Sequence, residues 1–205
     1  MQSKFVVFDG PDGSGTTRNS QALAEILREQ GIPVILTVEP THSPIGKEIR
    51  KILHGDTLPS PDAMQLLFCA DRAEHVATII QPALDEGKTI ICDRYVLSTI
   101  IYGSVLGLDA KWLEKVNEQF PKPDLTIVTL PPYEVCRERI GQRTSADQFE
   151  NDEFQRRIYD AYRAVEDPTT IFIDTNKSRE EVTDDVYRKV RDYFGPLSRE
   201  TIEQL

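Results

Sequence analysis

Glycines between residues 9 and 21, in the stretch DGPDGSGTTRNSQ, have the spacing of a phosphate-binding loop. In the pattern G-x-x-x-x-G-K-[ST], backbone N–H groups surround phosphate oxygens, the lysine reaches the outer phosphates, and the hydroxyl binds Mg²⁺. Gly10 and Gly15 fill the glycine positions and Thr17 fills the hydroxyl position, but Thr16 stands where lysine is expected. The stretch therefore predicts a phosphate site without its usual ammonium group. The candidate loop residues are Gly10, Pro11, Asp12, Gly13, Ser14, Gly15, Thr16 and Thr17.

The same residues could instead form an ordinary glycine-rich turn capped by a threonine, and their spacing does not decide between the two. The position in the chain favours the phosphate loop, because the turn follows the first predicted strand and precedes the first predicted helix. In a phosphate loop we expect Thr17 to coordinate Mg²⁺ and Asp12 to hold the metal or a substrate hydroxyl. Arg18 is a poor substitute for lysine, because two helical steps turn its side chain by roughly 200° from the direction of residue 16.

Short apolar runs alternate with helical patterns along the chain. The runs are rich in Val, Ile, Leu and Phe with little polar alternation, as in parallel strands that are buried on both faces. The predicted strands are residues 4–10, 33–39, 88–93, 124–130 and 170–174. The predicted helices are residues 15–30, 60–84, 150–166 and 178–194. This order predicts an α/β three-layer sandwich, in which helices cover both faces of a five-stranded parallel sheet.

Acidic residues stand at or beside the carboxyl ends of four predicted strands, namely Asp9, Glu39, Asp93 and Asp174. Ligands of such sheets bind beyond these ends of the strands. The clustering therefore favours a phosphate and metal site over a simple scaffold. Asp93 followed by Arg94 is the strongest of these signals, because a charge pair at the carboxyl edge of a sheet has little structural purpose.

The composition is that of one globular domain, which we expect to span residues 1–205. The chain has 24 Lys and Arg against 34 Asp and Glu, a formal charge of −10, which argues against binding nucleic acid through a broad basic face. Its apolar runs are too short for a membrane span, and the N-terminal run is too short for a signal peptide. The three cysteines and three histidines lack zinc-site spacing, so we expect reduced thiols and a cytoplasmic protein.

Four segments resemble a known family. They are the opening loop, EPTHSPIGKEIR at 39–50, LLFCADRAEHV at 66–76 and DRYVLSTIIYG at 93–103. Together, and in this order, they are similar to the bacterial and archaeal thymidylate kinases, which are P-loop nucleoside monophosphate kinases. The resemblance implies a P-loop NTPase fold with a lid, ATP and Mg²⁺ as cofactors, and transfer of the γ-phosphoryl group of ATP to dTMP. It also suggests a homodimer, with helix 60–84 as the expected contact surface.

The resemblance also assigns an acceptor site. Phe68 resembles the aromatic residue that stacks on thymine, and Arg72 resembles the residue that reaches the base and the phosphate. Arg50 and Arg94 match the arginines that grip the acceptor phosphate, a role that suits a planar, always charged group. The remaining implied residues are Asp93 at the metal and proton-handling end of the third strand, Ser98 and Thr99 at the thymine edge, and Tyr102 under the sugar. Structural alternatives are a core position for Phe68, a surface ion pair of Arg72 with Asp71, and simple packing for Tyr102.

Residues 136–150, CRERIGQRTSADQFE, resemble the lid of this family. In one branch of the family an arginine lies inside the phosphate loop, and in the other branch it comes from the lid. This loop has Gly13 and Ser14 where such an arginine would stand, so the lid arrangement fits. Arg143 is then the first candidate to reach the transferring phosphoryl group, with Arg139 next. Alternatively, Arg143 and Arg137 could be solvated charges on an exposed helix. The predicted catalytic residues are Asp12, Asp93, Arg94 and Arg143.

Two other functions remain open from the sequence. Thr16 in place of lysine would also suit a nucleotide-binding pseudokinase that transfers phosphate slowly. A kinase for another nucleotide or deoxynucleoside could share the fold. The three arginines at positions 50, 72 and 94 favour a monophosphate acceptor, because an uncharged nucleoside would leave them unpaired.

Overall fold

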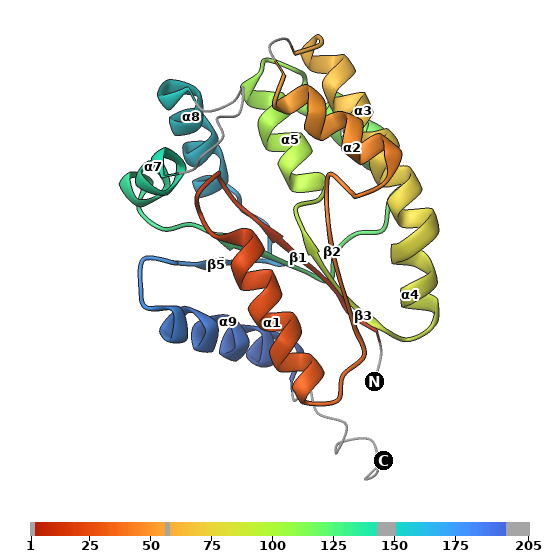
Figure 1. Ribbon diagram of the computed structural model, residues 1–205, viewed down its shortest axis with the longest axis vertical. Coiled ribbons are helices and arrows are strands. Elements are labelled where there is room, and N and C mark those ends of the chain that lie inside the picture. The colour runs from red at the N-terminus through yellow and green to blue at the C-terminus, as the bar shows by residue number, and fades with distance from the viewer. Residues whose placement is uncertain (1–2, 56–57, 143–150, 196–205) are drawn as a thin grey trace.

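The computed structural model of the chain describes residues 3–55, 58–142 and 151–195. Its centre is a five-stranded parallel sheet with the strand order β2-β3-β1-β4-β5 (Figure 1). The strands are β1 (Phe5–Asp9), β2 (Val34–Val38), β3 (Thr89–Asp93), β4 (Leu125–Thr129) and β5 (Thr170–Ile173). Each strand lies within one of the predicted ranges, and the sandwich predicted from the alternating pattern is confirmed.

Burial on both faces explains why the central strands are mostly apolar, and their register places their ends side by side. Phe8 of β1 lies beside Asp93 of β3, and Asp9 lies beside Val128 of β4. Every residue of β1, β3 and β4 is buried, because helices cover both faces of the sheet. The same register brings the carboxylates that end β1 and β3 to one edge of the sheet.

Helices α1 (Thr16–Glu29) and α9 (Arg179–Phe194) cover one face of the sheet (Figure 1). Val6 and Phe8 pack there with Leu23 and Leu27 of α1 and with Val186 of α9. Helix α1 begins directly after the glycine-rich loop and stops before Gly31, whose φ is +77°. Bonds from the N–H of Gly31 to the carbonyl of residue 28 and from residue 32 to residue 27 close a Schellman end, as the glycine predicts.

The other face carries a long helical segment. Prediction gave one helix over 60–84, and the structure contains α3 (Pro61–His75), a π-helical stretch η1 (Val76–Ile80) and α4 (Gln81–Asp85) without a break between them. Pro82 explains the wider turn, since it offers no N–H to the preceding turn and its ring crowds the carbonyl four residues earlier. Phe5 and Val7 pack on this face against Ile80 and Ala83.

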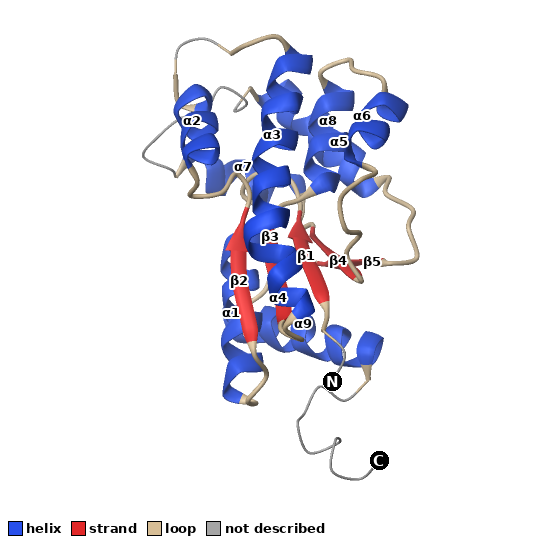
Figure 2. Ribbon diagram, turned by 90° about the vertical axis from the view of Figure 1, so that its right-hand side faces the viewer, coloured by secondary structure: helices blue, strands red, loops and turns tan. Residues whose placement is uncertain are grey.

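Further helices gather beyond the carboxyl ends of the strands (Figure 2). They are α2 (Pro44–Leu53), α5 (Val96–Val105), α6 (Ala110–Asn117), α7 (Tyr133–Gly141) and α8 (Asp152–Arg163). Of these only α8 was predicted as a helix. Within the described ranges, no helix has the length and apolar character needed to cross a membrane. The carboxyl ends of the strands therefore face these helices, and most of the predicted site residues lie between the two.

Candidate active site

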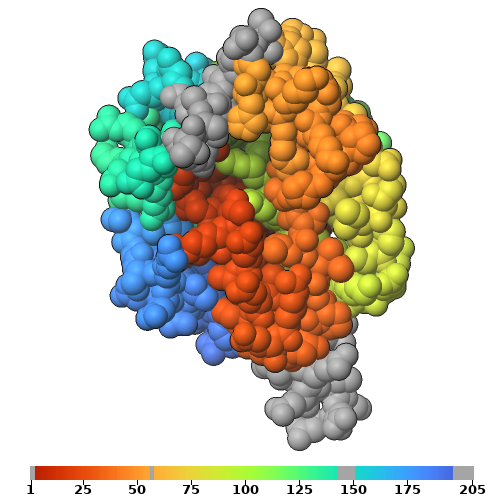
Figure 3. Space-filling model, viewed as in Figure 1, coloured from red at the N-terminus to blue at the C-terminus, as the bar shows by residue number. Residues whose placement is uncertain are grey.

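A pocket of about 280 Å³ lies beyond the carboxyl ends of β2 and β3. The space-filling view shows the surface hollowed where the phosphate loop meets the segment after β2, with the β3–α5 segment at the floor of the hollow (Figure 3). Two residues of the glycine-rich loop, Asp12 and Thr17, line this pocket. Most of the other predicted site residues line it too, namely Arg50, Phe68, Arg72, Asp93, Arg94, Ser98, Thr99 and Tyr102.

The glycine-rich loop has a backbone shape that ordinary side chains rarely adopt. Gly13 and Gly15 have φ values of +75° and +96°, and a Cβ on Gly13 would collide with the carbonyl oxygen of Cys136 on α7. Gly15 occupies the N-cap position of α1, and no side chain among the described residues caps that end. The first N–H groups of a helix have no intrahelical acceptor, so this uncapped end can bind an anion.

Side chains from two neighbouring strands fix the position of the loop. The hydroxyls of Ser14 and of Thr129, the last residue of β4, lie 2.8 Å apart, and the hydroxyl of Thr175, beyond β5, donates to the carbonyl of Ser14 at 2.7 Å. Arg139 of α7 donates to the carbonyls of Gly13 at 3.3 Å and Thr175 at 2.9 Å. The loop is therefore tied to the base of the segment that was predicted to be the lid.

Thr17 and Asp93 meet at the junction of α1 and β3. The Thr17 hydroxyl donates to Oδ2 of Asp93 at 2.5 Å, and Oδ1 of Asp93 is buried without a hydrogen-bond partner among the described residues. No group of three or more His, Cys, Asp or Glu side chains gathers in the described part of the chain as a complete metal site. Mg²⁺ is usually held by one or two protein oxygens together with substrate phosphates and water. The hydroxyl and the unpartnered carboxylate oxygen therefore suit Mg²⁺ bound with a nucleotide.

Asp12 and Arg94 form an ion pair at the centre of the pocket. Their charged groups are 2.6 Å apart, and Arg94 also donates to the carbonyl of Gly10 at 3.0 Å. The second oxygen of Asp12 accepts from Tyr102 at 3.1 Å and from Gln155 of α8 at 3.0 Å. Both oxygens of Asp12 thus already have protein partners. These contacts do not test its predicted role as a metal ligand, which stays a prediction. Arg94 has a φ of +67°, an uncommon conformation for a residue other than glycine, which turns the chain sharply at the end of β3.

A second buried carboxylate, that of Asp9 at the end of β1, is linked to the ion pair through Ser98, whose hydroxyl also accepts a bond from Arg94. It accepts from the N–H of Gly10 at 3.0 Å, from the hydroxyl of Ser98 at 2.6 Å and from the hydroxyl of Tyr162 at 2.5 Å. Burial raises the pKa of Asp9, while the charge of Arg94 and the bonds from Ser98 and Tyr162 oppose the rise. The hydroxyl of Ser98, predicted at the thymine edge, is therefore engaged at the sheet.

Arg72 is fully buried on the wall of the pocket that α3 forms. Its Nε donates to Glu39 at 2.9 Å, one of its terminal nitrogens donates to Thr99 at 3.1 Å, and its guanidinium lies 4.9 Å from the ring centre of Tyr95. The structural alternative of a surface ion pair between Arg72 and Asp71 is therefore wrong. Asp71 accepts hydrogen bonds from the loop after β2, whereas the side chain of Arg72 binds Glu39 and Thr99.

Arg50 of α2 closes the side of the pocket next to β2. Its guanidinium donates to the carbonyls of Pro40 and Thr41, which follow β2. Glu39, at the end of β2, holds both Arg72 and His75, each at less than 3 Å. Arginines from α2, α3 and the β3–α5 turn thus converge on one cavity, as expected for a site that receives an anionic ligand.

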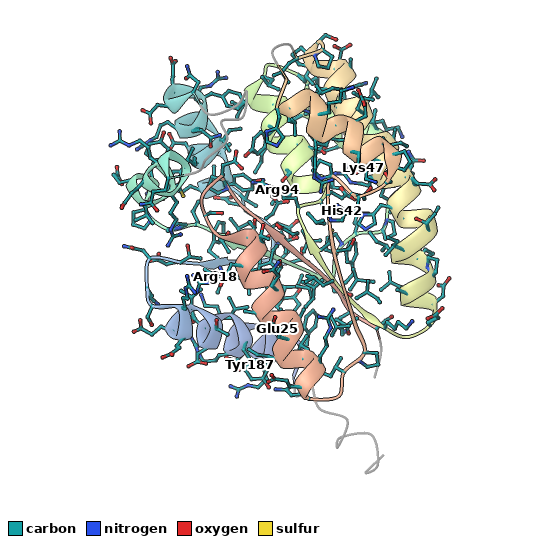
Figure 4. All side chains as sticks on the ribbon, in the orientation of Figure 1. Arg18, Glu25, His42, Lys47, Arg94 and Tyr187 are labelled. Atoms are coloured by element: carbon teal, nitrogen blue, oxygen red, sulfur yellow. The ribbon has the colours of Figure 1, made fainter. Side chains whose placement is uncertain are left out.

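The predicted lid arginines lie in different surroundings. Arg139 contacts the phosphate loop as described above, Arg137 is exposed, and Arg143 lies outside the described residues. Arg94 lies in the middle of the view in Figure 4, near the strand ends, whereas Arg18 projects from α1 on the side of α9. Arg18 lines a groove with residues of α9 and does not line the pocket, as the helical rotation predicted.

Several residues that shape the site were not predicted as site residues from the sequence. Thr129, Thr175 and Gln155 hold the loop and Asp12 from distant parts of the sequence, and no short motif marks them. Asp9 and Glu39 carried a signal, since both stand at strand ends, but they bind other side chains at the base of the pocket. Gln65 also lines the pocket, and nothing in its neighbourhood in the sequence distinguished it.

Comparison with known proteins agrees with this geometry. A family model described as thymidylate kinase matches residues 8–186 of the chain. The chain is 39% identical over 199 residues to a probable thymidylate kinase of Pyrococcus horikoshii, an alignment that covers 93% of this chain and 97% of that protein. It is 38% identical over 202 residues to a thymidylate kinase of Halothermothrix orenii, with 93% and 98% covered.

A thymidylate kinase of Caldicellulosiruptor saccharolyticus is 36% identical over an alignment of 205 positions, which covers 96% of this chain and 98% of that protein. The relatives thus match along nearly their whole length. The chain belongs to the thymidylate kinase family.

Proposed function

We propose that the chain transfers the γ-phosphoryl group of ATP to dTMP, giving ADP and dTDP. Family membership supports the reaction class. The observation that carries the proposal is the composition of one pocket: Thr17 and Asp93 line it beside the phosphate loop, and Arg50, Arg94 and Phe68 line it as well. Such a cavity suits a ligand with a phosphate at one end and a flat ring at the other.

The donor nucleotide would bind on the loop side. Backbone N–H groups of the loop and the uncapped start of α1 would hold its phosphates. Thr17 and Asp93 would hold Mg²⁺, which supplies positive charge to the phosphate oxygens when it is bound. Asp93 orients the Thr17 hydroxyl, because its Oδ2 already accepts a hydrogen bond from it. The Oδ1 atom of Asp93 remains to bind Mg²⁺, a hard cation that prefers oxygen ligands.

The acceptor would bind between α3 and α5. A guanidinium has five N–H donors, and Gly10, Ser98 and Asp12 accept bonds from only some of those on Arg94. The remaining donors can bind the acceptor phosphate next to the loop. Phe68 would stack on the base, and Tyr102, fixed by its bond to Asp12, would lie under the sugar.

The charge of the missing lysine would come from arginines. Arg139 already contacts the loop through the carbonyl of Gly13, and Arg143 follows it in the segment that we expect to close over the phosphates. Phosphoryl transfer depends mainly on positioning and charge stabilisation, with no covalent intermediate on the protein. Closure over the phosphates would exclude water, which could otherwise accept the phosphoryl group.

A coupled assay of ADP release tests the proposal. With Mg²⁺, ATP and dTMP we expect turnover in the usual kinase range of roughly 1–100 s⁻¹. The acceptors dUMP, dCMP and thymidine should be compared in the same assay. Tight binding of dTMP without turnover would instead identify a pseudokinase, and preference for another acceptor would identify a different nucleotide kinase.

We also infer a cytoplasmic homodimer. Leu66 and Ile79 are exposed apolar side chains, 48% and 40% accessible, on the long helical segment of α3 and η1. A second copy of this chain would cover them. The free, buried thiols of Cys69, Cys92 and Cys136 suit a reducing compartment. Light scattering during size-exclusion chromatography should give twice the monomer mass, and Leu66→Lys should return the mass to that of one chain.

A further inference from the structure

Gln65 carries a buried side-chain amide on the wall of the pocket. It lies on α3, is 1% exposed and lines the pocket, yet neither its Oε1 nor its Nε2 has a hydrogen-bond partner among the described residues. Buried polar groups are almost always paired, because an unpaired amide loses its bonds to water without replacement. A polar group left in this state on a pocket wall indicates a contact that a ligand completes.

The helix geometry places Gln65 in the part of the pocket with the aromatic ring. Gln65, Phe68 and Arg72 are spaced three and four residues apart, so they share one face of α3. Thr99 of α5 accepts a bond from Arg72 across this part of the pocket. The hydroxyl of Tyr95, which also lines the pocket, is likewise buried and has no hydrogen-bond partner in the described part of the chain. This end of the pocket therefore offers several polar atoms beside an aromatic surface.

The opposite helix makes room for this glutamine. Gly103 of α5 has no side chain, and a Cβ there would lie 3.3 Å from Cγ of Gln65 and 2.7 Å from Cδ1 of Leu113. Any larger residue at position 103 would push the stem of Gln65 or the side chain of Leu113 aside. The pair of Gly103 and Gln65 therefore fixes the stem of the glutamine between the helices while its amide faces the pocket.

We propose that Gln65 is a base-binding residue of the acceptor site. The edge of thymine presents an N3–H donor flanked by carbonyl acceptors. A carboxamide presents one acceptor and one donor side by side, so it can accept from N3–H and donate to the adjacent carbonyl oxygen. The ring would stack on Phe68 while the amide holds its edge. This inference rests on the proposed function, because it takes dTMP as the acceptor.

Substitution of Gln65 by methionine tests the proposal. Methionine keeps the length and the unbranched shape but removes both hydrogen-bonding atoms. We expect Gln65→Met to raise the Kd of dTMP by roughly 10- to 100-fold, the loss of two neutral hydrogen bonds. Titration calorimetry measures this without turnover. Gln119→Met makes the same change at an exposed position outside the pocket and should leave the Kd unchanged.

A ligand without a base separates base binding from a general disturbance of the pocket. The affinity for 2-deoxyribose 5-phosphate, measured by NMR titration, should be the same for Gln65→Met and wild type. The melting temperature of unliganded Gln65→Met should be equal to or above that of wild type, because the variant removes an unpaired buried amide. If Gln65→Met folds poorly, Gln65→Leu provides the same comparison.

Two results would overturn the inference. One is a dTMP affinity of Gln65→Met equal to that of wild type, which would leave the amide to an ordered water. The other is an equal loss of affinity for dTMP and for the sugar phosphate. If wild type phosphorylates dTMP and either of these results is obtained, the inference is refuted and the proposed function stands. Wild type that neither binds nor phosphorylates dTMP refutes the proposed function, and the inference fails with it.

Discussion

Removal of the Thr17 hydroxyl should affect both stability and catalysis, and the structure gives the size of the first effect. Thr17→Val keeps the shape of the side chain but deletes the bond to Oδ2 of Asp93, which is 2.5 Å long. Asp93 is 5% exposed, and its other oxygen is already unpartnered within the described chain. The variant therefore leaves a buried carboxylate without that bond, at a cost of about 1.5–3 kcal/mol in the free energy of unfolding.

A chain of this size loses about 2–4 °C in melting temperature for each kcal/mol. We therefore expect unliganded Thr17→Val, in a chelator, to melt roughly 3–12 °C below wild type. Thr17→Ser keeps the hydroxyl and is the matched control, and it should melt close to wild type. Scanning calorimetry of the three proteins at one pH gives the comparison.

The catalytic part of the same prediction uses Mg²⁺ and ATP. A ligand that binds only the folded state raises its melting temperature. Mg·ATP should therefore stabilise wild type and Thr17→Ser, and it should stabilise Thr17→Val much less. Turnover of Thr17→Val should fall on the order of 10²-fold, as for loss of one preorganised contact to the transferring charge. Equal melting and equal turnover of the valine and serine variants would refute the assignment of Thr17 and Asp93 as the metal site.

Three further predictions concern the loop, the lid and the sheet. Thr16→Lys should raise kcat in the ADP-release assay or leave it unchanged, and a collapse of activity would show that the loop requires threonine there. Arg143→Ala should lower kcat by roughly 10²–10³-fold with little change in the Kd of ATP, whereas an unchanged kcat would contradict the lid assignment. Burial holds the pKa of Asp9 above its ordinary value of 3.8, so the folded chain binds that proton more tightly than the unfolded chain. The free energy of unfolding of wild type relative to Asp9→Asn, from urea titrations, should therefore fall as the pH rises from 3.8 through the raised pKa of Asp9, and a constant difference would contradict this sign.

The strands and the long helices were predictable because burial leaves a pattern in the sequence. The sequence of β3 predicts a strand because every residue in it is buried and most are apolar. The sequence of α1 predicts a helix because its apolar side is regular and Gly31 ends it. Helix α5 had no such pattern. Its sequence VLSTIIYGSV is apolar on most sides, since it packs against α3, α6 and α8, and its periodicity is that of neither a surface helix nor a strand.

Site positions at strand ends were predictable for the same topological reason, but their partners were not. The neighbour of Arg72 in sequence is Asp71, whereas its partner in space is Glu39, 33 residues earlier. Adjacent helical residues point about 100° apart, so sequence neighbours on α3 rarely pair. Gln155 reaches Asp12 from a position 143 residues away, and only the packing of α8 beside the loop brings them together. Such contacts depend on tertiary structure that no local pattern encodes.

The ion pair of Arg94 and Asp12 has a consequence for how the two substrates influence each other. One guanidinium holds the carbonyl of Gly10 and the carboxylate of Asp12, so it grips the donor loop at two points from the acceptor side. A phosphate that draws Arg94 toward itself must change the energy of those two bonds. By thermodynamic reciprocity, a nucleotide seated on the loop then alters the affinity for the acceptor by the same factor as the acceptor alters the affinity for that nucleotide. A neutral nucleoside would leave the grip unchanged, so we expect this cooperativity only with phosphorylated acceptors.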